Sequence, residues 1–129
     1  MLLAISMETS EYGFRFQNWE VYREARSFRV FILGIVNTFP VDERFVLKDQ
    51  ARRALGSIIL NIAEGANRRT DRDMVVFINR SRTSLDEVVA ILDCALDDAY
   101  LSEAIYRECL EKASVIAKML NRFTSRLSK

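Results

Sequence analysis

Arginine side chains in the middle of this 129-residue chain offer its clearest chemistry. The guanidinium group binds a phosphate through two parallel hydrogen bonds, which the ammonium group of lysine does not do. Several such groups together neutralise several phosphates of a nucleic acid. The sequence therefore predicts a nucleic-acid-binding surface at seven positions, namely Arg52, Arg53, Arg68, Arg69, Arg72, Arg80 and Arg82.

Some basic residues have a second interpretation. Arg53 and Arg82 lie near apolar stripes, so they could instead bind acids of a neighbouring subunit. Arg44, Lys48 and Arg52 form a row at spacing four, which repels itself unless acids oppose it. The helical register places the first two of this row level with acids of the third helix. We therefore predict that Arg44 and Lys48 are mostly salt-bridged, with partners among Asp86, Glu87 and Asp93.

Base stacking is not expected from the pattern. No aromatic residue interleaves with the basic cluster in the manner of a platform for single-stranded bases. Recognition of the backbone or the shape of a structured RNA or DNA is therefore expected. Asn61 is predicted to form a hydrogen bond between helices, and Glu64 to pair with Arg68 four residues later.

Enzymatic chemistry finds little support. The chain has no histidine and only four glycines, which excludes histidine-based acid–base catalysis and a phosphate-binding glycine loop. Asp93, Asp97 and Asp98 could hold a divalent cation, but a solvated acidic surface is preferred because no second set of ligands accompanies them. Cys94 and Cys109 lack metal-ligand spacing and are predicted to be small buried hydrophobes. We predict no enzyme, no cofactor and no metal.

Composition limits the organisation of the chain. Half of the residues are hydrophobic, which suffices for one core and one domain. We expect residues 1–13 to form a mobile N-terminal tail and residues 14–129 to form the domain. The longest apolar run, Val30–Val36, is far shorter than the ~20 residues that span a bilayer, and no signal peptide is visible. A soluble cytoplasmic protein with no membrane partner is predicted.

Four helices must position the arginines. Capping residues predict where these helices begin, at Asn18, Asp42, Thr70 and Ser102. Pro40 stops the first helix, and Gly65 is expected to end the second in a left-handed conformation. The third helix has core positions at helical spacing, which are Met74, Ile78, Ser81, Leu85, Val88, Leu92 and Ala95. Because the connections are short, we predict an all-α, antiparallel up-down-up-down four-helix bundle.

Charge separates along such a bundle. Because the helices alternate in direction, the end of the second, the start of the third and the end of the fourth share one end of the bundle. We call this the basic end, and it gathers Arg68, Arg69, Arg72, Arg122, Arg126 and Lys129, with Arg15 close by. The opposite, acidic end gathers Asp42, Glu43, Asp93, Asp97, Asp98 and Glu103. Such segregation orients or steers a partner.

The first helix is apolar on nearly every side. A helix in a monomeric bundle needs an apolar stripe on one side only, whereas this helix carries Phe28, Val30, Phe31, Ile32, Leu33, Ile35 and Val36. Its own bundle could wrap it deeply, but a second buried contact is the preferred interpretation. We predict a homo-oligomer with Phe31, Leu33 and Ile35 at the interface.

Several motifs occur in a recognisable order. They are Phe16–Tyr22 with Ala25, Phe39–Pro40, Gln50–Gly65 with its ending Asn61–Gly65, and Ser81–Glu87. From about Phe14 to Leu120 the chain resembles the bacterial four-helix-bundle family of 23S rRNA intervening-sequence proteins, related to the accessory variability determinant of diversity-generating retroelements. The resemblance implies a ring-shaped homopentamer. It has departures, since Ile59 and Leu60 stand where many members carry Pro and Ser, and Thr83 where Gly is usual.

These patterns predict a non-catalytic nucleic-acid-binding or ribonucleoprotein accessory protein that assembles as a ring. The alternative is a protein-interaction adaptor whose basic and acidic ends engage protein partners.

Overall fold

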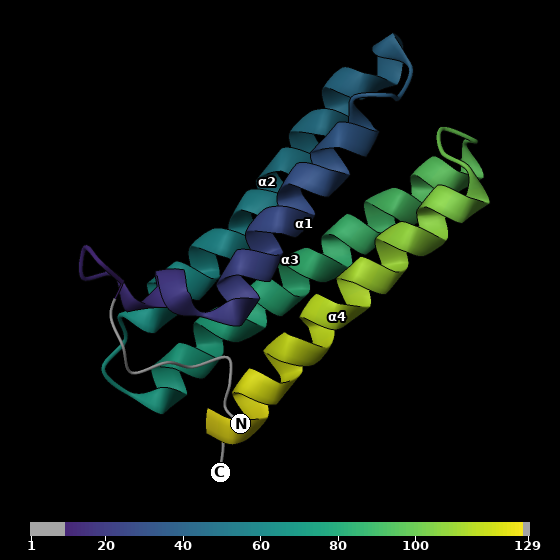
Figure 1. Ribbon diagram of the computed structural model, residues 1–129. Helices are drawn as coiled ribbons and strands as arrows, with labels where there is room; N and C mark the ends of the chain where they lie inside the picture. The colour runs from purple at the N-terminus through teal and green to yellow at the C-terminus, as the bar shows by residue number, and fades with distance from the viewer. Residues whose placement is uncertain (1–9, 128–129) are drawn as a thin grey trace.

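The computed structural model describes residues 10–127, apart from the side chains of residues 43–45. A short 3-10 helix precedes four α-helices (Figure 1), and the elements are η1 (Arg15–Asn18), α1 (Glu20–Val36), α2 (Val41–Ala66), α3 (Asp71–Asp97) and α4 (Glu103–Leu127). The described part of the chain contains no strand. The predicted all-α four-helix bundle is therefore confirmed, whereas residues 1–9 of the expected tail lie outside the described residues.

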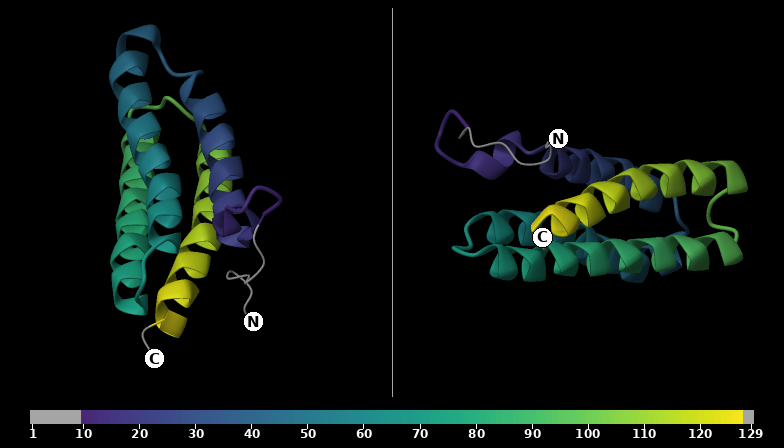
Figure 2. Two further views of the ribbon diagram at one scale, coloured as in Figure 1. Left: turned by 90° about the vertical axis from the view of Figure 1, so that its left-hand side faces the viewer. Right: turned by 90° about the horizontal axis from the view of Figure 1, so that it is seen from below.

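The four helices lie side by side, and the chain reverses direction at each connection (Figures 1 and 2). At one end of the bundle the rings of Trp19 and Phe123 join α1 to α4, with centroids 5.2 Å apart. At the other end Phe39 and Tyr100 join the two connections, with centroids 5.6 Å apart. Aromatic pairs of this kind bury large apolar surfaces and hold the two ends of the bundle closed.

Helix α1 begins in a way that the capping pattern did not predict. Asn18 was expected to be the cap, but it is the last residue of η1, and Trp19 occupies the position before the helix without a side-chain capping bond. The backbone N–H of Trp19 donates to the Phe16 carbonyl at 3.0 Å, and its side chain is almost fully buried. Burial of the large indole ring therefore decides where the helix starts, because it outweighs one capping hydrogen bond.

Helix α2 differs from expectation at both ends. It begins at Val41, two residues earlier than a cap at Asp42 requires, because Pro40 supplies the pre-set φ of −54°. Gly65 is not left-handed but remains helical and buried, and the left-handed prediction is wrong. A Cβ atom at Gly65 would lie 3.1 Å from the Phe77 Cβ of α3. The glycine therefore permits close approach of two helices rather than helix termination.

Helices α3 and α4 follow the sequence pattern closely. The Thr70 hydroxyl accepts a hydrogen bond from the Asp73 N–H at 3.1 Å, and the Ser102 hydroxyl accepts one from the Ile105 N–H at 3.2 Å. All seven core positions predicted for α3 are buried. Local capping and helical spacing thus suffice to place these two helices.

The connection between α3 and α4 contains a strained residue. Ala99 has a φ of 61°, which is the left-handed conformation that side chains with a Cβ rarely adopt. Around it the Tyr100 N–H donates to the Ala95 carbonyl at 2.8 Å, and the Ala99 N–H donates to the Leu96 carbonyl at 3.0 Å. This pattern closes a helix C-terminus, and glycine is the usual residue at its left-handed position.

Replacing Ala99 with glycine should therefore stabilise the protein. We expect Ala99→Gly to raise the free energy of unfolding by about 0.5 to 1 kcal/mol, because the relief of left-handed strain exceeds the entropy that glycine adds to the unfolded chain. The matched control is Ala90→Gly, at an exposed position within α3. This substitution should lower the free energy of unfolding by about 1 kcal/mol. Urea unfolding measures the free energy of unfolding of both variants. A loss of stability in both would contradict the backbone strain at Ala99.

Candidate nucleic-acid interface

The seven predicted arginines occupy three parts of the bundle. Arg52 and Arg53 lie on α2, Arg80 and Arg82 on α3, and the remaining three where α2 gives way to α3, at Arg68, Arg69 and Arg72. All are exposed except Arg82, which is half-buried. These guanidinium groups therefore lie at the surface, but the acidic and aromatic side chains beside them differ from one arginine to the next.

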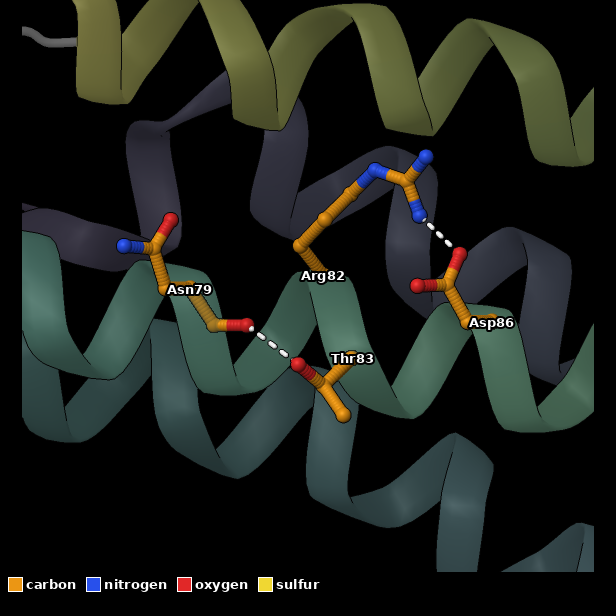
Figure 3. Close-up of polar contacts among 4 residues, drawn as sticks. All are labelled: Asn79, Arg82, Thr83 and Asp86. Atoms are coloured by element: carbon orange, nitrogen blue, oxygen red, sulfur yellow. Dashed lines mark hydrogen bonds and ion pairs between the residues drawn. The ribbon is translucent and has the colours of Figure 1, made fainter.

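Two of the arginines already have acidic partners. Arg53 forms an ion pair with Asp49, one turn away along α2. Arg82 forms one with Asp86, one turn away along α3 (Figure 3). The alternative of acids from a neighbouring subunit is therefore not needed to neutralise either charge. The i,i+4 spacing of each pair is visible in the sequence and could have revealed both. Exposed pairs of this kind are weak, but they reduce the free positive charge that meets a phosphate.

The salt bridges expected across α2 and α3 do not form at Lys48. Lys48 makes no ion pair with any described residue, while the Arg44 side chain lies outside the described part. Two of the three expected acids are engaged elsewhere, because Asp86 binds Arg82 and Asp93 accepts a hydrogen bond from the Tyr106 hydroxyl. That hydrogen bond raises the pKa of Tyr106, since it favours the protonated phenol beside a carboxylate.

An aromatic ring does lie within the basic cluster, contrary to expectation. The guanidinium carbons of Arg68 and Arg80 lie 4.7 Å and 4.8 Å from the centroid of the Phe77 ring. Arg68 also donates from Nε to the backbone carbonyl of Glu64 at 3.1 Å. The predicted ion pair with the Glu64 carboxylate is therefore wrong. The sequence pattern did not indicate this ring because Phe77 stands three residues before Arg80 in the chain. In a helix, residues three apart lie side by side, so the two side chains touch.

Three further arginines surround an open hollow between α1 and α2. The hollow has a volume of about 530 Å³ and is lined by Arg23, Arg26, Ser27, Arg29, Val30 and Ile59. No acid lines it, and none of its arginines makes an ion pair within the described chain. The seven positions predicted from the sequence do not include these three arginines, although their spacing of three along α1 indicates one side of a helix.

Arg52 extends this basic surface onto α2. It precedes Ile59 by seven residues, which is close to two full helical turns, so the two side chains leave the same side of the helix. Arg52 is exposed and makes no ion pair with a described residue. We call Arg23, Arg26, Arg29 and Arg52 the α1–α2 arginine surface.

The basic end forms as the register predicted. Figure 1 shows that the end of α2, the start of α3 and the end of α4 lie at one end of the bundle. Arg15 also lies there, because its guanidinium donates to the Ala66 carbonyl at the end of α2 at 2.7 Å. Lys129 is outside the described residues. At the acidic end, Glu103 pairs with Arg107, while the Glu43 side chain is not described.

Polar residues line a second hollow, between α2 and α3. Asn61 donates to the backbone carbonyl and the hydroxyl of Ser57, at 2.9 Å and 3.0 Å, so its own hydrogen bonds stay within α2. The predicted bond from Asn61 to another helix is therefore wrong. The Ser84 hydroxyl makes the link between helices instead, by donating to the Ser57 hydroxyl at 2.8 Å.

The apolar residues expected at an oligomer interface are partly covered by their own chain. Phe31, Leu33 and Ile35 are half-buried against the core, and the Lys112 ammonium lies 4.8 Å from the centroid of the Phe31 ring. Phe31 also lines a hollow of about 220 Å³ between α1 and α4, beside Val115. Helix α1 is therefore less exposed than its composition indicates.

Comparison with protein families identifies the family of this chain. The family model of the 23S rRNA-intervening sequence protein matches residues 17–122. The chain belongs to this family. A search of curated proteins found no match. The matched region runs from η1 nearly to the end of α4, and it includes both hollows beside α2.

Metal-ligating side chains and the two cysteines can be placed in the described part of this family member. Within residues 10–127, no three or more His, Cys, Asp or Glu side chains are grouped to hold a metal ion. No described helix is long and apolar enough to cross a membrane. The two cysteines differ from each other, because Cys109 is buried as predicted whereas Cys94 is exposed. Burial raises the pKa of the Cys109 thiol to about 11.

The two thiols should react very differently. At pH 8 a disulfide reagent such as dithionitrobenzoate should modify one cysteine per native chain, because the thiolate is the nucleophile and Cys109 stays protonated and covered. Unfolding in urea should release the second thiol. The variant Cys94→Ser should be unreactive until it unfolds. Rapid reaction of Cys109 in the native variant would contradict its placement in the core.

Proposed function

We propose that this protein is a non-catalytic nucleic-acid-binding or ribonucleoprotein accessory protein. The observation that carries the proposal is the α1–α2 arginine surface, whose hollow no acid lines. Unpaired guanidinium groups around an open hollow suit phosphate oxygens, because each group presents paired donors in a fixed plane. Membership of a family named for an intervening sequence of 23S rRNA supports RNA as the nucleic acid.

The charge of the whole chain makes this surface more significant. The formal net charge is only +1, so a generally basic exterior does not explain nucleic-acid affinity. Binding must instead come from local surfaces, where unpaired arginines release counterions from the phosphates that they contact. Arg53 and Arg82 contribute less under this proposal, since each already faces an aspartate.

Assembly as a homo-oligomer, with five subunits in a ring, is part of the proposal. A ring would repeat the arginine surface around one particle and raise its overall affinity through multivalency. The hollow between α1 and α4 is the supporting feature, because Val115 is 46% exposed beside Phe31. The resemblance to the accessory variability determinant extends the same proposal to a retroelement ribonucleoprotein.

A protein-interaction adaptor is the second candidate. Val30 and Leu60 are 68% and 62% exposed, and Val30 lies beside the arginines of α1. A surface that mixes exposed apolar side chains with arginine is typical of protein interfaces. This candidate predicts a protein partner and no affinity for nucleic acid near physiological salt.

Removal of unpaired arginines should weaken nucleic-acid binding. The triple variant Arg26→Ala, Arg29→Ala, Arg52→Ala should bind a structured RNA with lower affinity than the wild type. The slope of log affinity against log salt concentration should become shallower by about 0.7 to 0.9 for each phosphate contact that is lost. The matched control is Arg53→Ala, Arg82→Ala, which removes arginines that already have acids and should change the slope less. Fluorescence anisotropy at several salt concentrations measures both.

Two results would contradict this part of the proposal. Wild-type protein without affinity near physiological salt would favour the adaptor. Equal losses per arginine in the two variants would mean that ion pairing does not distinguish free from engaged arginines, even if binding is real.

Assembly can be tested at the hollow between α1 and α4. We expect Phe31→Glu and Val115→Glu to dissociate the oligomer, because each places a carboxylate in an apolar contact between subunits, where burial of the charge is costly even beside Lys112. Val76→Glu on α3 is the control, since Val76 is 44% exposed and lies outside this hollow. Multi-angle light scattering at micromolar concentration measures the mass, and a monomeric wild type would eliminate the ring.

A further inference from the structure

The hollow between α2 and α3 differs in chemistry from the α1–α2 arginine surface. It has a volume of about 380 Å³ and is lined by Ser57, Asn61, Val76, Asn79, Arg80, Thr83 and Ser84. Hydroxyl and amide groups predominate, and Arg80 is the single charged residue of the lining. The volume falls at the small end of ligand sites, which span about 300 to 1,000 Å³. We call this hollow the α2–α3 groove.

The groove retains unused hydrogen-bonding capacity. The hydroxyls of Ser57 and Ser84 share one hydrogen bond, so one of their two hydrogens has no acceptor among the described residues. Asn61 uses its Nδ2 group within α2, which leaves its Oδ1 oxygen as an acceptor without a described partner. A donor and an acceptor therefore lie side by side. This arrangement complements the polar edge of a nucleobase, which also carries donors and acceptors together.

A planar cation borders the same groove. Arg80 lines it, and the Phe77 ring lies 4.8 Å from its guanidinium carbon. Arg68 contacts the same ring at 4.7 Å, so the ring is shared by two guanidinium groups. Unpaired bases stack on aromatic rings and on arginine guanidinium planes. Contact with Phe77 reduces the freedom of Arg80 and so lowers the cost of ordering it against a base.

We propose that the α2–α3 groove binds an unpaired nucleotide, with its base stacked on the Arg80 guanidinium and the base edge hydrogen-bonded to Ser57 and Asn61. This inference rests on the proposed function and names the part of the nucleic acid that is recognised. A base within a duplex offers neither feature, because its pairing edge and both of its faces are occupied. The α1–α2 arginine surface then binds phosphates of any sequence, while the groove selects a bulge or loop.

The experiment compares two short RNA stems that differ only in one bulged nucleotide, together with their DNA equivalents. Wild-type protein should bind the bulged stem about tenfold more tightly, as expected for one stacked base. Arg80→Lys keeps the charge but removes the stacking plane. It should abolish the preference for the bulge and change affinity for the paired stem much less, because the positive charge is retained. Asn61→Ala should reduce the preference about fivefold through the lost base-edge hydrogen bond.

Arg107→Lys is the matched control, because it makes the same change at an exposed position of α4, outside both the groove and the α1–α2 arginine surface, and should retain the preference for the bulge. Circular dichroism melting of each variant establishes that the bundle is intact. Equal wild-type affinity for both stems, or a preference that survives Arg80→Lys, would overturn the groove assignment while the proposed function stands. Absence of affinity for either stem would instead refute the proposed function itself. A preference confined to RNA would identify the 2′-hydroxyl as a further contact.

Discussion

The close contact between α2 and α3 is the constraint on which the other features depend. A Cβ atom at Gly65 would crowd the Phe77 Cβ at 3.1 Å, and the buried Ser81 hydroxyl donates to the Ile58 carbonyl at 2.7 Å. A small residue and a satisfied buried hydroxyl allow two helix backbones to approach without an unpaired polar group. That approach brings Arg68 into contact with the Phe77 ring, and it makes Ser57 and Ser84 neighbours across the helices.

Charge on the two sides of α2 follows from this geometry. On the side of α1, arginines surround a hollow without acids, so the local field is positive although the chain is nearly neutral. On the side of α3, polar groups predominate and Arg80 lies against an aromatic ring. Ion pairs within single helices moderate the charge of Arg53 and Arg82. Helix α2 therefore separates a surface suited to phosphate from a groove suited to a base.

Much of the fold could be predicted because it depends on local signals. Thr70 and Ser102 cap their helices with the expected hydrogen bonds, and every predicted core position of α3 is buried. The errors occur where distant contacts override those signals. Burial of Trp19 displaced the expected cap at Asn18, and packing against Phe77 kept Gly65 helical. A capping hydrogen bond stabilises a helix by about 1 kcal/mol, which the burial of one large side chain exceeds.

By itself, the sequence determined the helical class and the family, because periodicity, capping and motif order are properties of residues close in the chain. It could not determine which arginines from different helices share one surface, or what lies beside them across the helix contacts. The arginines of α1 meet Ile59 of α2 only after the helices pack, and the hydroxyl link from Ser84 to Ser57 joins residues that are distant in the chain. Contacts between helices depend on how each helix is rotated about its axis, and tertiary packing alone fixes that rotation.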